Sequence, residues 1–310
     1  RRSFEPLPAG GLEGRTRAML KIEDGCVNFC SYCIIPYARG RVRSLPLEQC
    51  AHEAQALAEA GYQEIVLTGI EISSWGQDLG DGLSLIDAVE AICRALPGHI
   101  RVRLGSLEPR TITPEFCRRA AALTNLCPHF HLSMQSGCDT VLARMNRKYN
   151  SARYYESVKL LNEAYETPGI TTDLIVGFPG ETEEEFQHLL DFIREAELDR
   201  VGCFTYSPVD GAKANDFPDA VPDDVKEDRR RRFMEVQAEV SAAKLKRRIG
   251  NVETVLIDEP EDEDGVAVGR TAHEAPEVDG VVYVTVTRPV KPGEFVRAKI
   301  VRTEEHDLVA

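Results

Sequence analysis

Three cysteines near the start of the chain have a spacing that suits iron–sulfur chemistry. Cys26, Cys30 and Cys33 follow directly after a short apolar segment. Three thiolates can ligate three irons of a [4Fe–4S] cluster, which leaves the fourth iron without a nearby protein ligand. An iron left open in this way could take the amino and carboxylate groups of S-adenosylmethionine. The spacing therefore predicts a catalytic cluster that binds this cofactor.

A structural zinc site is the alternative interpretation of the same cysteines. Zinc in such sites normally has four ligands, often arranged as two close pairs. The nearest additional donors, Cys50 and His52, belong to the helix expected next along the chain. The sequence therefore favours the cluster over zinc.

The segments around these cysteines alternate between short apolar runs and longer amphipathic runs. Strands that alternate with helices indicate a parallel sheet with right-handed crossovers. Six such units predict an α/β fold built as an open, partial (βα)6 barrel. The expected strands are Ala18–Ile22, Glu64–Thr68, Ile100–Leu104, His129–Ser133, Thr171–Val176 and Val201–Tyr206.

Helix signals lie between these strands. Pro46 suits a first helical turn, and Gly61 suits the end of the same helix. Thr182 and Glu185 form a capping box ahead of an apolar face that begins at Phe186. In such folds the chemistry lies on the loops after the strands. The loops expected to form the site are 23–44, 69–82, 105–113, 134–150 and 177–182.

The last third of the chain follows a different pattern. Residues 222–249 read as one long linking helix with a net positive charge, for which RNA contact is a second interpretation. From residue 250 onward, short strands separated by Gly, Pro and Asp predict a small OB-like β-barrel. Its 14 acidic and 6 basic residues give it a charge of −8. The expected strands there are Val252–Ile257, Val266–Arg270, Val281–Val286 and Phe295–Arg302.

The whole composition restricts the class of protein. The 310 residues carry a net charge of −14, which argues against coating nucleic acid by bulk electrostatics. We find no apolar run of about 20 residues and no signal segment, so we expect no membrane span and a cytoplasmic location. Nine cysteines are then expected to be reduced. Residues 1–16 read as a linker from a missing N-terminal domain.

The segment CVNFCSYCIIPYARGRVR, residues 26–43, resembles the signature of the radical-SAM methylthiotransferases. Further matches are residues 67–69, 132–137 and 173–182, and the terminal barrel is similar to the TRAM domain of that family. The resemblance covers residues 17–310. It implies that reductive cleavage of S-adenosylmethionine gives a 5′-deoxyadenosyl radical, which abstracts a hydrogen before a methylthio group is installed.

The resemblance also implies a second [4Fe–4S] cluster in the missing N-terminal domain, where it serves sulfur delivery. None of the other six cysteines forms a comparable triplet, and they read as core thiols. We therefore expect this chain to cleave S-adenosylmethionine but to fail at sulfur insertion. An electron donor such as flavodoxin or ferredoxin is expected, and the protein is expected to be a monomer.

The family's cofactor contacts carry over to eight positions of this sequence. Tyr32 would lie along the adenine, and the residues after the second strand would approach the methionine part. Each residue also has a purely structural explanation, such as strand-end capping. The eight are Tyr32, Thr68, Gly69, Glu71, Gln135, Ser136, Asp173 and Gly177.

Two groups of basic residues follow the cluster cysteines and the fourth strand. They lie on the expected loops 23–44 and 134–150. If both loops face the mouth of the barrel, these residues offer phosphate or protein contacts around the site. Exposed side chains on solvated loops are the alternative. The residues are Arg39, Arg41, Arg43, Arg144, Arg147 and Lys148.

The two parts of the chain point to different substrates. Residues 17–182 look most like the branch that acts on N6-threonylcarbamoyladenosine beside the tRNA anticodon. Residues 189–310 resemble the branch that modifies an aspartate of the twelfth small-subunit ribosomal protein. A fusion of two relatives would explain this change of resemblance along the chain. Because substrate atoms must reach the catalytic loops, we expect tRNA processing. The ribosomal protein is the alternative, and the acidic barrel favours it.

Two other classes of function stay open at this point. One is a non-catalytic RNA-binding module with a structural metal, which would yield no 5′-deoxyadenosine. The other is a radical enzyme that only abstracts hydrogen from a small molecule. The terminal barrel argues against the second class, because small-molecule enzymes seldom need a domain that recruits a macromolecule.

Overall fold

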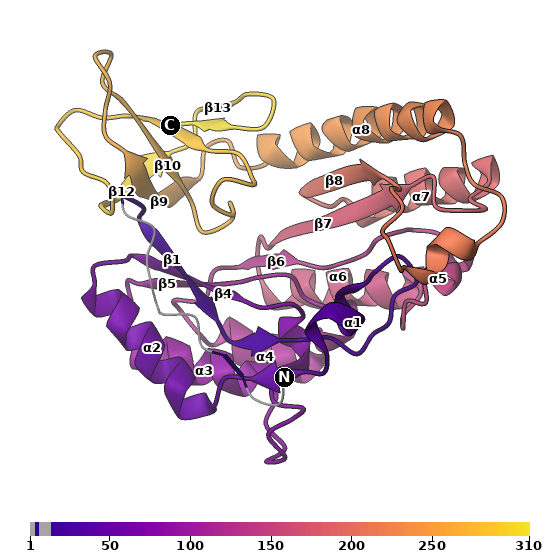
Figure 1. Ribbon diagram of the computed structural model, residues 1–310. Coiled ribbons are helices and arrows are strands. Elements are labelled where there is room, and N and C mark those ends of the chain that lie inside the picture. The colour runs from indigo at the N-terminus through magenta and orange to yellow at the C-terminus, as the bar shows by residue number, and fades with distance from the viewer. Residues whose placement is uncertain (1–3, 6–13) are drawn as a thin grey trace.

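Six parallel strands form an open arc in the computed structural model, which describes residues 4–5 and 14–310 (Figure 1). One sheet has the order β1-β4-β5, and a second has the order β6-β7-β8. Parallel bridges such as Leu107 to Leu132 join the two, so the arc is continuous. Its strands are β1 (Arg17–Lys21), β4 (Glu64–Thr68), β5 (Arg101–Leu104), β6 (His129–His131), β7 (Gly169–Val176) and β8 (Arg200–Thr205).

All six expected strands of the partial barrel are present, and each strand end lies within two residues of its expected position. The expected linker, residues 1–16, lies largely outside the described residues. Among the described residues, no helix has the length and apolar character needed to cross a bilayer.

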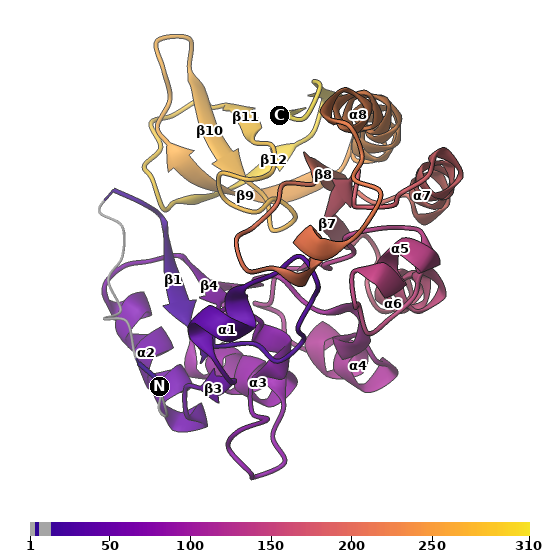
Figure 2. The ribbon, with the colours of Figure 1, turned by 45° about the vertical axis from the view of Figure 1, so that its right-hand side comes forward.

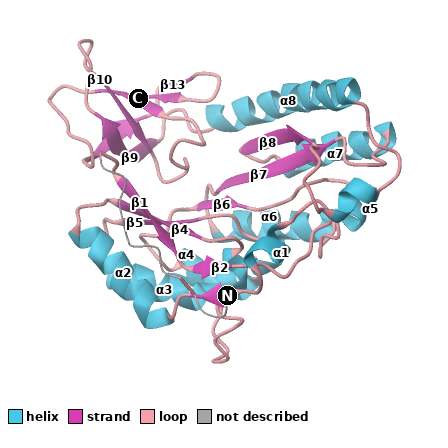
Figure 3. Cartoon of the chain, in the orientation of Figure 1, coloured by secondary structure: helices cyan, strands magenta, loops and turns pink. Residues whose placement is uncertain are grey.

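Helices cover the outer side of the arc (Figure 3). The capping box at Thr182 and Glu185 starts α7 as expected, and Phe186 and Ile193 on its apolar face are fully buried. The helices are α1 (Ile35–Arg39), α2 (Leu47–Glu59), α3 (Leu85–Ala95), α4 (Pro114–Ala121), α5 (Asp139–Arg144), α6 (Ser151–Ala164), α7 (Glu183–Ala196) and α8 (Asp223–Lys246), with short 3-10 turns at Ile72–Ser74, Pro109–Thr111 and Lys213–Asp216.

A curled six-stranded sheet forms the C-terminal part and has the order β12-β9-β10-β11-β14-β13. Its two-residue strands β13 and β14 are too short to leave a period-2 pattern, so the sequence did not reveal them separately. The strands are β9 (Val252–Glu259), β10 (Val266–Arg270), β11 (Val282–Thr285), β12 (Phe295–Lys299), β13 (Arg302–Thr303) and β14 (Leu308–Val309).

The long helix α8 connects the two parts physically. Phe233 is buried in the core of the barrel, whereas Leu245 belongs to the core of the C-terminal sheet. Most of its arginines form ion pairs with nearby acids, such as Arg231 with Asp228 at 2.7 Å. This arrangement matches the linking-helix interpretation better than an RNA-contacting one.

The C-terminal sheet docks against the N-terminal ends of the barrel strands (Figure 2). Arg103 on β5 donates from Nε to Oε1 of Glu64 at 2.9 Å and from Nη1 to the carbonyl of Ala272 at 3.0 Å. Arg270 of the sheet lies 3.5 Å from the same carboxylate. A buried ion-pair network therefore holds the sheet at the end of the barrel opposite to the cluster loop.

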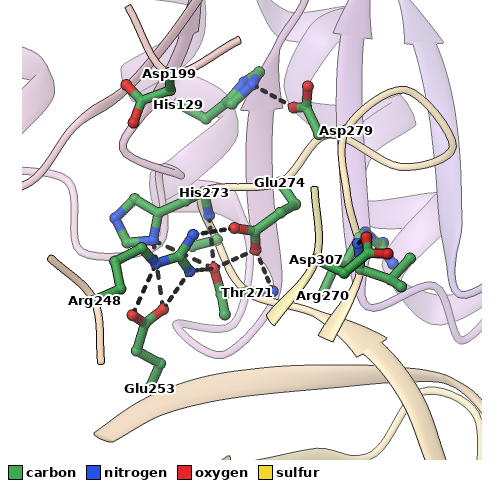
Figure 4. Close-up of polar contacts among 12 residues, drawn as sticks. His129, Asp199, Arg248, Glu253, Arg270, Thr271, His273, Glu274, Asp279 and Asp307 are labelled. Atoms are coloured by element: carbon green, nitrogen blue, oxygen red, sulfur yellow. Dashed lines mark hydrogen bonds and ion pairs between the residues drawn. The ribbon is translucent and has the colours of Figure 1, made fainter. Parts of the chain in front are cut away.

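A second group of polar contacts extends this interface (Figure 4). His129 at the start of β6 lies 3.0 Å from Asp279. Arg248, just after α8, pairs with Glu253 at 2.6 Å and also with Glu274, which is buried. The pair of His129 and Asp279 joins the barrel to the sheet, and the pairs of Arg248 join the end of α8 to the sheet.

We expect acid to weaken this interface. Burial alone would raise the pKa of Glu64, but Arg103 and Arg270 hold that pKa down at about 2. Arg248 likewise overcomes burial and holds the pKa of Glu274 at about 2. Between about pH 4.5 and pH 2 the unfolded chain binds protons that the folded chain does not. The free energy of unfolding must therefore fall as the pH is lowered through this range.

The expected slope is about 1.4 kcal/mol per pH unit for each such carboxylate. Urea denaturation at a series of pH values measures it. Glu64→Gln should make the slope shallower in the acid range, because this variant has no carboxylate to titrate. An unchanged slope in that variant would contradict the assignment.

Candidate active site

The cluster loop leaves the end of β1 and is closed by a small ladder that the sequence did not reveal. Strands β2 (Glu23–Asp24) and β3 (Arg43–Ser44) pair antiparallel at the two ends of the loop. Gly25 has a positive φ of 97°, and a Cβ at this position would collide with the carbonyl of Arg41. Only glycine therefore fits where the two ends of the loop cross.

The three cysteines of this loop differ from the other six. Cys26, Cys30 and Cys33 are partly exposed. The remaining thiols are all buried, as expected for core cysteines; they are Cys50, Cys93, Cys117, Cys127, Cys138 and Cys203. Three accessible thiols on one short loop are a suitable donor set for an iron–sulfur cluster.

Among the described residues, no group of three or more His, Cys, Asp or Glu side chains lies close enough together to hold a metal ion as the chain stands.

A guanidinium group lies beside the second cysteine. Arg147 Nη1 donates to the sulfur of Cys30 at 3.2 Å and to the hydroxyl of Tyr32 at 3.4 Å. The Tyr32 hydroxyl is thus held within the protein next to the cluster loop. Burial raises the pKa of Tyr32, so this phenol stays protonated at neutral pH.

The end of β4 brings together Gly69, Glu71 and a residue that the sequence analysis missed, Glu23. A Cβ on Gly69 would lie 2.8 Å from the carbonyl oxygen of Glu23 and 2.9 Å from its carboxylate. The Glu23 carboxylate in turn accepts from the backbone of Glu71 at 2.7 Å. Gly69 is therefore explained by the close approach of Glu23, whether or not a ligand also lies there.

Both carboxylates are perturbed by their surroundings. Burial raises the pKa of Glu23 to about 8, and its Oε1 has no hydrogen-bond partner among the described residues. Burial also raises the pKa of Glu71, although Ser74 and Ser73 donate to it. A carboxylic acid directly after an apolar strand was the only sequence signal for Glu23.

A cavity of about 640 Å³ opens beside the cluster loop and the ends of β4 and β5. This volume falls within the range of about 300–1,000 Å³ that is typical of small-molecule sites. Of the eight expected cofactor residues, Glu71 lines it, together with Asn28 of the cluster loop and Arg110. Thr68 lies at the end of β4, and its backbone carbonyl accepts a hydrogen bond from the backbone N–H of Ile22 at 2.9 Å.

The other expected cofactor residues lie on a different side of the barrel mouth. Gln135 has a φ of 71° in the left-handed region, a conformation that non-glycine residues rarely adopt. The hydroxyl of Ser136 is buried and accepts from Cys138 at 3.2 Å. Asp173 lies 3.5 Å from His131 and remains half exposed. The structure thus divides the expected cofactor residues into two groups.

Gly177 has a structural explanation of its own. Its φ is 71°, and a Cβ there would collide with the side chain of Lys226 on α8. Its backbone donates to Glu181 at 2.8 Å, and burial raises the pKa of Glu181 to about 6. Packing of α8 is therefore sufficient to require glycine.

Three of the six expected substrate arginines and lysines are partly or fully buried among partners within the protein. Arg43 is buried, donates to the carbonyl of Arg41 at 2.7 Å and lies 3.3 Å from Asp24. Arg144 pairs with Glu185 at 2.7 Å. Arg147 also has partners within the protein, because it donates to Cys30 and Tyr32, and a substrate contact by any of the three stays a prediction.

The remaining three basic residues keep the expected exposure. Arg39 is half exposed and lies 4.0 Å from Asp24. Arg41 and Lys148 are exposed, and Lys148 donates to Asn146 at 2.8 Å. These three are the more exposed members of the set.

Residues 20–193 match the model of the Radical SAM superfamily, and residues 249–310 match that of the TRAM domain. Both findings agree with the fold, because the first covers the partial barrel and the second covers the C-terminal sheet.

Curated relatives extend the match over almost the whole chain. The ribosomal protein uS12 methylthiotransferase RimO of Chromobacterium violaceum is 44% identical over 94% of this chain and 68% of its own length. The RimO proteins of Aeromonas salmonicida and Alteromonas mediterranea are each 42% identical, over 98% and 96% of this chain. The chain spans 62–70% of the length of these three relatives.

These relatives overturn the expected tRNA substrate. Their similarity runs through both parts of the chain, including the catalytic loops that resembled the tRNA-modifying branch. The tRNA expectation gave the segment around the cysteines more weight than the rest of the chain, and it was wrong. The alternative interpretation, a ribosomal-protein substrate, agrees with the relatives better.

Solved structures support the fold alone. Coproporphyrinogen III oxidase (HemN) from Escherichia coli has a TM-score of 0.54 at 15% identity, over 74% of this chain and 53% of its own. The methyltransferase TsrM from Kitasatospora setae has a TM-score of 0.52 at 20% identity, over 61% of this chain and 36% of its own.

Proposed function

The chain belongs to the radical SAM superfamily, among the methylthiotransferases of ribosomal protein uS12, and from this premise we propose that it modifies an aspartate of that protein. The observation that carries the proposal is the 40–44% identity to such enzymes over 94–99% of the chain. The cofactors are a [4Fe–4S] cluster and S-adenosylmethionine.

When bound, these cofactors supply the 5′-deoxyadenosyl radical that abstracts hydrogen from the substrate carbon. Cys26, Cys30 and Cys33 would hold the cluster through their thiolates. The ladder of β2 and β3 fixes the two ends of their loop. The cavity beside that loop would take S-adenosylmethionine and shield it from water. The eight expected cofactor residues stay proposals for contacts to its methionine and adenosine parts.

The charge of the C-terminal sheet supports a protein substrate. Its net charge of −8 suits a basic ribosomal protein better than a phosphate backbone. The turn between β9 and β10 carries the exposed acids Asp262, Glu263 and Asp264, next to the exposed Glu259 at the end of β9, and it projects from the sheet at the top left of Figure 1. We propose that this acidic surface attracts the basic partner.

The division of the chain follows from these roles. We propose a radical core over residues 17–221, a linking helix over 222–249 and a TRAM domain over 250–310. A small reducing protein such as flavodoxin or ferredoxin would deliver the electron. We propose that the chain acts as a monomer.

Substrate-dependent cleavage of S-adenosylmethionine tests the proposal. The anaerobically reconstituted chain receives S-adenosylmethionine and dithionite, with isolated uS12, bulk tRNA or neither. We expect uS12 to accelerate 5′-deoxyadenosine formation about tenfold or more, because a bound hydrogen donor consumes the radical. Acceleration by tRNA but not by uS12 would reject the proposal, and the Cys30→Ala variant gives the background.

A further inference from the structure

The end of α5 directs one arginine at the cluster loop. Asn146 has a φ of 59°, and the backbone of Arg147 donates to the carbonyl of Leu142 at 2.9 Å. A left-handed residue at this place ends a helix and reverses the chain. The reversal brings the Arg147 side chain toward Cys30 instead of into solvent.

Several hydrogen bonds attach this helix end to the cluster loop independently of the guanidinium. The backbone of Ser31 donates to the carbonyl of Met145 at 3.0 Å, and its hydroxyl donates to the carbonyl of Arg144 at 2.8 Å. The side chain of Asn146 donates to the carbonyl of Phe29 at 2.7 Å. The loop should therefore keep its place when only the side chain of Arg147 is changed.

The guanidinium itself is fixed from several sides. Its Nε donates to the hydroxyl of Tyr149 at 3.0 Å, and its Nη2 donates to the carbonyl of Ser133 at 3.2 Å. The ring of Tyr149 lies 4.9 Å from the centre of the guanidinium. These contacts leave Nη1 to donate to the sulfur of Cys30 at 3.2 Å.

Arg147 has no carboxylate partner within 4.0 Å among the residues that the structure describes, in contrast to Arg144 nearby. Its hydrogen-bond partners are neutral oxygens and the sulfur of Cys30. A partly buried cation without a carboxylate is costly unless another anion compensates it. With the cluster bound, the thiolate by which Cys30 would hold it is such an anion, next to Nη1.

We propose that Arg147 raises the reduction potential of the cluster by donating a hydrogen bond to the Cys30 sulfur and by adding a positive charge beside it. Net charge and hydrogen bonds to sulfur are main determinants of such potentials. One-electron reduction makes the cluster more negative, so a neighbouring cation stabilises the reduced form. This role concerns the cofactor and does not depend on which substrate the enzyme modifies.

Potentiometric titration of the reconstituted chain, followed by electron paramagnetic resonance, tests the proposal. We expect Arg147→Met to lower the midpoint, so that at a fixed potential the ratio of reduced to oxidised cluster falls about tenfold, or 59 mV for one electron. Arg147→Lys should lie between wild type and Arg147→Met, because it keeps the charge without the planar fork. Arg118→Met, which removes an exposed arginine, should keep the wild-type midpoint.

Iron content and thermal unfolding of each variant show whether the cluster and the fold are intact. A cluster-loaded Arg147→Met with the wild-type midpoint would overturn the proposal. If Arg147→Met and Arg147→Gln both fail to take up iron, Arg147→Lys decides. A midpoint in that variant below the wild-type value would support the hydrogen-bond contribution, and a midpoint above the wild-type value would reject the tuning role.

Discussion

A variant carrying Cys26→Ala, Cys30→Ala and Cys33→Ala will take up essentially no cluster iron and will form no 5′-deoxyadenosine. These three thiols are partly exposed on one loop, whereas the other six lie in the hydrophobic interior. Loss of all three thiolates leaves the cluster without protein ligands. Iron and sulfide analysis after anaerobic reconstitution should fall from about four irons per chain to background.

Cys93→Ala is the matched control, because Cys93 is buried in α3 and packs in the barrel core. It should lose some stability and keep the full iron content. The triple variant should unfold cooperatively near the wild-type denaturant concentration of the cluster-free chain. Retention of a [4Fe–4S] signal in the triple variant would show that other residues hold the cluster.

Arg103→Met should lower the free energy of unfolding by about 3–5 kcal/mol, the usual cost of leaving one member of a buried ion pair without its partner. Arg103 and Glu64 are almost completely inaccessible to solvent. Arg103 also donates a hydrogen bond to the carbonyl of Ala272 in the C-terminal part. In the variant Glu64 loses both hydrogen bonds from Arg103, and Arg270 at 3.5 Å is its remaining ion-pair partner among the described residues. Urea denaturation at neutral pH measures the loss.

The double variant Glu64→Leu/Arg103→Met should recover much of the loss, because it removes both charges. Arg118→Met, in an exposed pair with Glu115 at 3.6 Å, should change the stability by less than about 1 kcal/mol. A loss in Arg103→Met as small as in this control would contradict a network that holds the two parts together.

Periodicity was sufficient to predict the barrel, because each strand and helix carries its own local pattern. Glu64–Thr68 and Val266–Arg270 were predicted to the residue, and the capping box at Thr182 began its helix as expected. Local signals fail where an element is short. The ladder of Glu23–Asp24 with Arg43–Ser44 has two residues on each strand, too few for a pattern.

The functions of individual arginines were not predictable from spacing. Arg39, Arg41 and Arg43 alternate in sequence, yet Arg43 turns inward because Asp24 and two backbone carbonyls lie there. Arg147 depends on the left-handed Asn146, and the partner it meets is 117 residues away. Such contacts arise only when distant segments come together.

The position of the C-terminal sheet was equally invisible in the sequence. It docks through Arg270, whose partner Glu64 begins the second barrel strand. Neither residue is unusual in its own segment. The sheet therefore lies at the end of the barrel strands opposite to the cluster loop (Figure 2).

The central claim is that this enzyme modifies a ribosomal protein. Its most direct test is expression of the complete gene in a host that lacks its own uS12 and tRNA methylthiotransferases. Mass spectrometry of uS12 peptides and of tRNA nucleosides from the same cells reports both products. We predict a methylthiolated aspartate peptide and unmodified nucleosides; a methylthiolated nucleoside together with unmodified uS12 would contradict the claim.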